Sequence, residues 1–141
     1  MNGGDDTLWI LGGTGYQETT DYVHSDGSVT SGPNIPTRTD GQCLVELPDT
    51  GNILHIGGDN TPTQHEVHLF NRTTETFTKL DNPLSEKRSN FGCAVFNSAK
   101  HGGRPIVFVG GGRYSKYTAE VLDYQVTTQW EASKHMKINH F

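Results

Sequence analysis

Three segments of this chain repeat one pattern, a short apolar run that ends in paired glycines. The runs cover residues 8–11, 53–56 and 106–109, and they are followed by the pairs Gly12-Gly13, Gly57-Gly58 and Gly110-Gly111. A recurrence at about 50 residues is the signature of repeat architectures, in which each unit buries an apolar face against its neighbour. The chain is therefore expected to contain about three copies of one small unit.

The second half of each unit repeats as well. A glutamate, Glu18, Glu66 or Glu120, opens a second run, and a third run begins at Val29, Phe77 or Trp130. The runs have four to eight residues, are rich in β-branched or aromatic side chains and are bounded by turn residues, which is typical of strands. Helical periodicity is not seen over eleven or more residues. Four short antiparallel strands per unit predict the blades of a propeller.

The segments between the units also match. Residues 38–45 superpose on residues 88–95 without a gap, which aligns Arg38 with Arg88 and Cys43 with Cys93. A disulfide needs close, facing Cβ atoms, which equivalent positions of adjacent blades do not usually provide. We therefore expect two free cysteines that pack as small buried hydrophobes.

This repeated pattern resembles the kelch repeat over residues 8–136. Its elements are, in order, the arginine, the strand with the cysteine, the apolar run with Gly-Gly, the glutamate and the aromatic residue. In more detail the chain is similar to the kelch proteins common in invertebrates. The resemblance implies an incomplete, all-β kelch-type propeller of about three four-stranded antiparallel blades. The implied units are residues 8–31 (strands two to four of one blade), 41–82 and 91–134 (full blades), and 137–141 (the start of a further blade).

The paired glycines are expected to serve sharp turns, because a backbone with positive φ is accessible mainly to glycine. Residues 110–112 lack the lysine of a phosphate-binding loop and precede a strand. Glu18, Glu66 and Glu120 occur once per unit, so we expect them to share one structural hydrogen-bonding role. Phe77 and Trp130 are expected to begin the outermost strands.

Composition excludes several functions. The chain of 141 residues has 11 Lys plus Arg against 16 Asp plus Glu, a net charge of −5 and no basic run, which argues against nucleic-acid binding. No apolar stretch approaches the ~20 residues of a membrane span. His65 and His68 lie three apart, so on a strand they point to opposite faces, and no metal or cofactor is expected.

Two classes of function remain. The first is a protein-interaction module whose inter-strand loops form one recognition face. Its candidate binding residues are Arg38, Arg88, Tyr16, Asn60, Arg113 and Tyr114. The resemblance implies that Arg38 and Arg88 present positive charge to an acidic peptide, although a structural role is equally open. The second class is an enzyme, such as a galactose oxidase-like copper oxidase. We expect the module without catalysis.

The first unit lacks its first strand, so the chain is expected to be cut at both ends. Three blades cannot close a ring, since propellers have four or more. We therefore expect either a piece of a six- or seven-bladed propeller or half of a two-chain ring. In the ring, residues 137–141 of one copy would supply the strand that the first unit of the other copy lacks.

Overall fold

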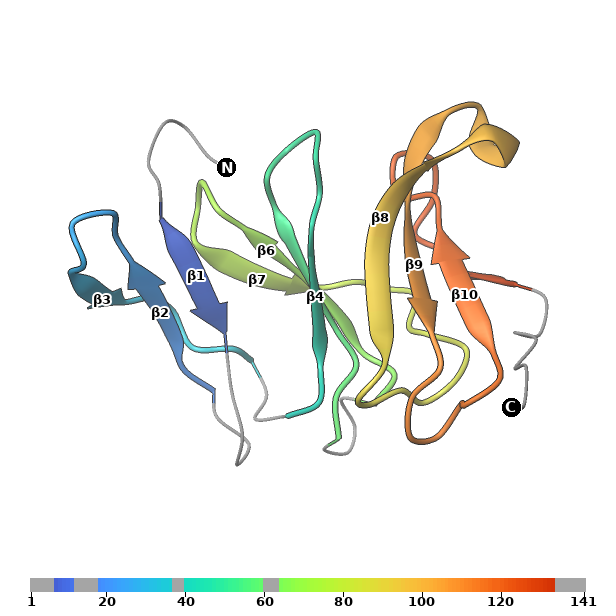
Figure 1. Cartoon of the computed structure of the whole chain (residues 1–141), viewed down its shortest axis with the longest axis horizontal. Helices are drawn as coiled ribbons and strands as arrows, with labels where there is room; N and C mark the ends of the chain where they lie inside the picture. Colours follow the sequence, from blue (N-terminus) through green and yellow to red (C-terminus); the bar gives the residue numbers. More distant parts are fainter. Residues whose placement is uncertain (1–6, 12–17, 37–39, 60–63, 134–141) are drawn as a thin grey trace, which may run out of the picture.

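A computed structural model describes residues 7–11, 18–36, 40–59 and 64–133 of the chain. Within these residues there are three antiparallel sheets of three, four and four strands. Figure 1 shows the sheets following one another along the molecule, each completed before the next begins. This arrangement confirms the predicted all-β fold of consecutive four-stranded units.

Each sheet is a meander whose strands lie in chain order. Sheet 1 contains β1 (Leu8–Leu11), β2 (Thr20–Val23) and β3 (Val29–Ser31). Sheet 2 contains β4 (Cys43–Glu46), β5 (Ile53–Ile56), β6 (Val67–Asn71) and β7 (Thr76–Lys79). Sheet 3 contains β8 (Gly92–Ser98), β9 (Arg104–Gly110), β10 (Ala119–Leu122) and β11 (Glu131–Ala132), with a 3-10 turn η1 (Ala99–His101) between β8 and β9.

The apolar runs of the sequence correspond to the buried central strands of sheets 2 and 3. β5 and β9 lie inside their sheets, and each is covered on both faces for part of its length, which explains why they read as continuous apolar runs. β3 and β11 form outer edges, where every residue is exposed. In the part of the chain that the structure describes, no helix has the length and apolar character needed to cross a bilayer.

The main core lies between sheet 2 and sheet 3. Its buried side chains are Val45, Leu47, Leu54, Ile56, Val67, Leu84, Val107, Val109, Leu122 and Trp130. Both sheets contribute to this single cluster, so each is stabilised chiefly by its neighbour.

Sheet 1 packs on the other face of sheet 2 through aromatic side chains. The ring of Trp9 lies 4.8 Å from that of Tyr22 and 4.8 Å from that of Phe70. The outward faces of the end sheets are less covered, since Ile10 of β1 is 46% exposed and Phe96 of β8 is 47% exposed. Both end sheets therefore carry apolar side chains that no other described element covers.

The hydrogen bonds show which glycines of sheets 2 and 3 occupy equivalent positions, and they differ from the pairs expected from the sequence. Gly57 N donates to Glu66 O (2.9 Å) in sheet 2, and Gly111 N donates to Thr118 O (3.0 Å) in sheet 3. Gly57 and Gly58 have φ of 63° and 135°, and Gly111 and Gly112 have φ of 71° and 104°. The equivalent pair is therefore Gly111-Gly112. The prediction of Gly110-Gly111 is wrong by one residue, because Gly110 still belongs to β9.

The three glutamates are not equivalent either, so their expected common role is wrong. Glu120 lies inside β10 opposite Val109, whereas Glu66 precedes β6. Glu18 O accepts from Ile35 N at 2.7 Å, as His65 O accepts from Leu84 N at 2.9 Å. The outer aromatics do correspond: Phe77 lies opposite Phe70, and Trp130, directly before β11, lies opposite Leu122 when the β10–β11 register is extended.

The expectation of free cysteines is wrong, because Cys43 and Cys93 form a disulfide with their Cα atoms 6.2 Å apart. Cys43 pairs with Ile56, but the residue at the equivalent position of sheet 3 is Gly92, which pairs with Gly110. Cys93 is therefore displaced by one residue along its strand. Since successive side chains point to opposite faces, this displacement turns the two cysteines toward each other across the sheets.

Gly57→Ala is expected to lower the free energy of unfolding by about 2–4 kcal/mol, because it combines a positive φ with a steric clash. A Cβ at Gly57 would lie 2.6 Å from the carbonyl oxygen of Arg88, a backbone atom that cannot easily move away. Gly103→Ala is the matched control, since Gly103 has a φ of 78° but open space around its Cβ position. Urea unfolding of both variants measures the difference, and equal losses would contradict the steric argument.

Candidate functional site

Loops from adjacent units meet at one end of sheets 2 and 3, along the lower edge of Figure 1. They are the links that lead into β4 and β8 and the turns after β5 and β9. Backbone hydrogen bonds join them, including Gly58 N to Arg88 O (3.0 Å), Asp59 N to Asp40 O (2.8 Å), Asn90 N to Gly41 O (2.8 Å) and Arg113 N to Ser89 O (2.9 Å). This bracing makes the loops part of the scaffold, as a preorganised binding surface requires.

Asp59 is the polar centre of this end. One of its carboxylate oxygens accepts from Arg113 Nη1 at 2.7 Å, and the other accepts from Tyr114 Oη at 2.7 Å. Ser89 Oγ also donates to Asp59, at 3.4 Å. The hydrogen bond to Asp59 raises the pKa of Tyr114 above its usual value, so the phenol stays protonated and acts as a donor.

The β9–β10 turn exposes two cationic and two aromatic side chains at this end. The side chain of Arg113 is 60% exposed, Tyr114 is 45% exposed and Tyr117 is 54% exposed, and Lys116 is exposed beside them. Ser115 is buried, and its Oγ donates to Lys87 O at 2.9 Å. We call Asp59, Arg113, Tyr114, Lys116 and Tyr117 the loop face. Tyrosine and arginine are enriched among the residues that dominate binding energy at protein interfaces.

Arg88 does not belong to this surface, so its expected contact with a partner is wrong. Its side chain is fully buried and its guanidinium donates to five acceptors. They are Glu120 Oε2 (3.2 Å), Gly111 O (3.0 Å), Thr118 O (3.0 Å), Ser115 O (3.3 Å) and Thr118 Oγ1 (3.0 Å). Arg88 therefore holds the base of the β9–β10 turn and positions the residues that the loop face exposes.

Of the other predicted site residues, Arg113 and Tyr114 meet on the loop face. Arg38, Tyr16 and Asn60 lie outside the described residues, as do Gly12, Gly13 and residues 137–141. The sequence alone did not indicate Asp59, Lys116 or Tyr117. Asp59 directly follows Gly57-Gly58, as Arg113 follows Gly111-Gly112, so the carboxylate and the guanidinium are equivalent residues of adjacent units. The one-residue error in the glycine alignment concealed this relation.

The histidines singled out earlier lie in separate environments. His65 Nδ1 lies 3.3 Å from Leu84 O, and His68 Nε2 lies 3.7 Å from Glu66. His55, whose ring centre is 6.2 Å from that of His68, is buried, and this burial lowers its pKa to about 4. No group of three or more His, Cys, Asp or Glu placed for a metal occurs within residues 7–11, 18–36, 40–59 and 64–133.

The comparisons define the fold class. The chain is similar to a solved structure of YjhT, with a TM-score of 0.75, 16% sequence identity and 92% of this chain covered. It matches half of that kelch-type propeller, since it covers 48% of the YjhT chain. No family model and no curated protein matches the sequence. The fold is thus that of a kelch-type propeller arc.

Proposed function

We propose that this chain is a protein-interaction module that binds an extended, acidic segment of a partner protein on the loop face. The observation that carries the proposal is the β9–β10 turn, which exposes two cations and two tyrosines above a base that is held by the hydrogen bonds of buried Arg88. Loops on a rigid scaffold commonly carry recognition. Catalysis is not part of the proposal.

The charge of the loop face favours an acidic ligand. Arg113 and Lys116 project from the same turn of a chain whose net charge is −5, so this positive region is local. Asp59 neutralises Arg113 only in part, because the guanidinium keeps donors beyond the one that it uses at 2.7 Å. A carboxylate of the partner can accept from those donors, while Tyr114 and Tyr117 supply apolar contact area.

Arg113→Ala with Lys116→Ala is expected to weaken binding of acidic peptides at least about tenfold, because it removes both cations of the turn. The probe is a display library of extended peptides rich in Asp and Glu, selected on the intact chain, and binding is measured by fluorescence anisotropy. A library rich in Lys and Arg is the charge control.

The matched protein control is Lys79→Ala with Lys100→Ala, which removes the same net charge at side chains that are 60% and 78% exposed outside the loop face. Equal loss in both double variants would show a general charge effect and overturn the proposed site. Tyr114→Phe tests the Asp59 contact separately, and Arg38→Ala tests the prediction for Arg38.

A further inference from the structure

Asn71, Arg72 and Thr73 form an Asn-x-Thr sequence, the acceptor pattern for N-linked glycans in secreted proteins. No other asparagine of the chain has Ser or Thr two residues later. A three-residue pattern also arises by chance. A glycan is therefore inferred only if the protein enters the compartment where glycans are added and if the amide of Asn71 is accessible in the fold.

The Cys43–Cys93 disulfide indicates the compartment. Disulfides persist in the secretory pathway and outside the cell, whereas the cytosol keeps thiols reduced. The chain has two cysteines, and both enter this bond, with their Cα atoms 6.2 Å apart. N-linked glycans are added in the same oxidising lumen in which disulfides form. The disulfide and the Asn-x-Thr sequence are therefore independent features that indicate one compartment.

The amide of Asn71 has a defined orientation in the β6–β7 hairpin. Asn71 is the last residue of β6, and residues 72–75 form the turn. Asn71 Oδ1 accepts from Thr73 N at 2.9 Å and from Thr74 N at 3.1 Å, which is an Asx turn. Among the described residues no acceptor binds Asn71 Nδ2, and this nitrogen is not one of their buried unpaired atoms. Nδ2 therefore faces solvent, beside the exposed Thr73 and Thr74.

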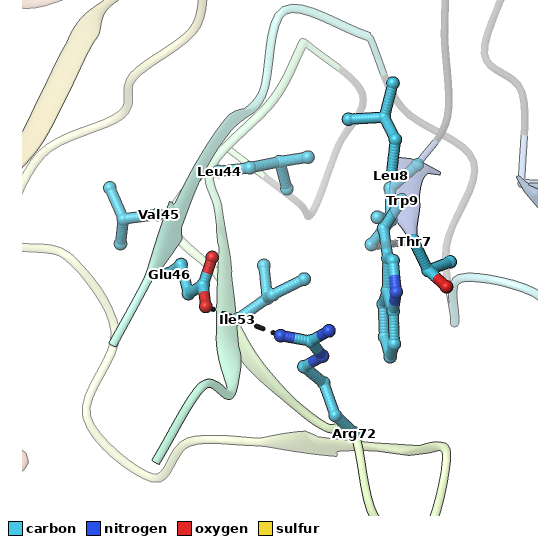
Figure 2. A pocket seen from close by; sticks show the side chains of 9 residues that line it. Thr7, Leu8, Trp9, Leu44, Val45, Glu46, Ile53 and Arg72 are labelled. Carbon is cyan, nitrogen blue, oxygen red and sulfur yellow. Dashed lines mark hydrogen bonds and ion pairs between the residues drawn. The ribbon is translucent and has the colours of Figure 1, made fainter. Parts of the chain in front are cut away.

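The middle residue of the pattern holds the hairpin in place. Arg72 N donates to Asn52 Oδ1 at 3.2 Å, and Arg72 Nη1 lies 3.4 Å from Glu46 Oε1. Figure 2 shows the guanidinium between Glu46 and Trp9, and it lies 4.5 Å from the centre of the Trp9 ring. The packed side chain is thus that of Arg72. A bulky group on Asn71 can extend into solvent without displacing these contacts.

We propose that Asn71 carries an N-linked glycan, which is attached in the lumen of the secretory pathway. Asn71 Nδ2 forms a bond to the anomeric carbon of an oligosaccharide that is linked to a lipid diphosphate. The bond from this carbon to the phosphate oxygen breaks, and the lipid diphosphate leaves with the electron pair. The amide nitrogen releases one of its two protons and keeps the other.

The glycan would lie at the end of sheet 2 opposite to the loop face. Val67, the first residue of β6, pairs with Ile56, which directly precedes the turn that contains Asp59. β6 runs from that turn to the hairpin at the other end of the sheet, as Figure 1 shows. The glycan therefore leaves the loop face free, and this inference does not depend on the proposed function.

The test uses the full-length protein isolated from its natural source with an antibody against this chain. Peptide N-glycosidase in water labelled with heavy oxygen is expected to convert Asn71 into labelled aspartate in most molecules, as measured by mass spectrometry. The same sample in labelled water without the enzyme is the control for spontaneous deamidation. An Asn71 that stays unlabelled after enzyme treatment would overturn the proposal.

Variants secreted from cultured eukaryotic cells test the acceptor residue. The wild-type protein is expected to lose the mass of one glycan on glycosidase treatment, whereas Asn71→Gln and Thr73→Ala should show no change. Thr73→Ser keeps the acceptor pattern, and Thr74→Ala is the matched control in the same exposed turn, so both should behave as the wild-type protein does. If Asn71→Gln does not fold because its Asx turn is lost, Thr73→Ala decides the point. A glycan that remains on Thr73→Ala would overturn the assignment to Asn71.

Discussion

Reduction of the Cys43–Cys93 disulfide is expected to lower the free energy of unfolding by about 4 kcal/mol, the loop-entropy value for a closed segment of this length. The two cysteines are 50 residues apart in sequence, and their bond ties β4 to β8. It therefore restricts the unfolded chain strongly and joins two sheets whose contact is the main core. Urea unfolding with and without a reductant measures the loss.

The double variant Cys43→Ala with Cys93→Ala separates the disulfide from other effects of the reductant. It should match the reduced wild-type protein in stability and should not respond to the reductant. Mass spectrometry after alkylation provides an independent check, since the oxidised protein should carry no alkylated cysteine. Two alkylated cysteines in the oxidised protein would show that the bond does not form.

The fold was predictable from sequence because its signals are local. The apolar runs of β1, β5 and β9 are each short, β-branched or aromatic, and ended by turn residues, and their recurrence indicated repeated units. The outer aromatics Phe77 and Trp130 were also recognised as equivalent from the sequence, because each opens the third run of its unit. These features need no knowledge of which side chain faces which sheet.

Register was not predictable, because a shift of one residue leaves the composition of a strand almost unchanged but reverses its faces. Three consecutive glycines at 110–112 permitted two alignments, and only the hydrogen bond from Gly111 N to Thr118 O selects one. The same kind of shift turned Cys43 and Cys93 toward each other. Sequence similarity aligned the cysteines, whereas strand pairing aligned Cys43 with Gly92.

The sequence predicted that the candidate site lies on the loops, but it did not predict which side chains meet there. Arg113 and Tyr114 were expected on the loops because polar residues between strands are usually exposed. Arg88 has the same sequence context, but its side chain turns inward to Glu120, 32 residues further along the chain. Asp59 and Arg113 are 54 residues apart. Contacts between residues so far apart in sequence depend on how two units pack against each other. A local sequence pattern does not predict this packing.

Arg88→Ala is expected to lower the free energy of unfolding by about 3–5 kcal/mol, because it leaves the buried carboxylate of Glu120 without its partner. The side chains of Arg88 and Glu120 are 0% and 2% exposed, and their closest charged atoms are 3.2 Å apart. The variant also removes the donors that satisfy the carbonyl oxygens of Gly111, Ser115 and Thr118. The β9–β10 turn should therefore lose order together with the stability of sheet 3.

Arg113→Ala is the matched control, because Arg113 also binds a carboxylate but lies at the surface. Its ion pair with Asp59 should contribute no more than about 1 kcal/mol to stability. Urea unfolding of the two variants compares a buried arginine with an exposed one in the same turn, and similar losses would contradict the structural role given to Arg88. If Arg88→Ala does not fold, the double variant Arg88→Met with Glu120→Leu decides the point. It removes both charges together, so it should be more stable than either single replacement if an unpaired buried charge is the cause of the loss.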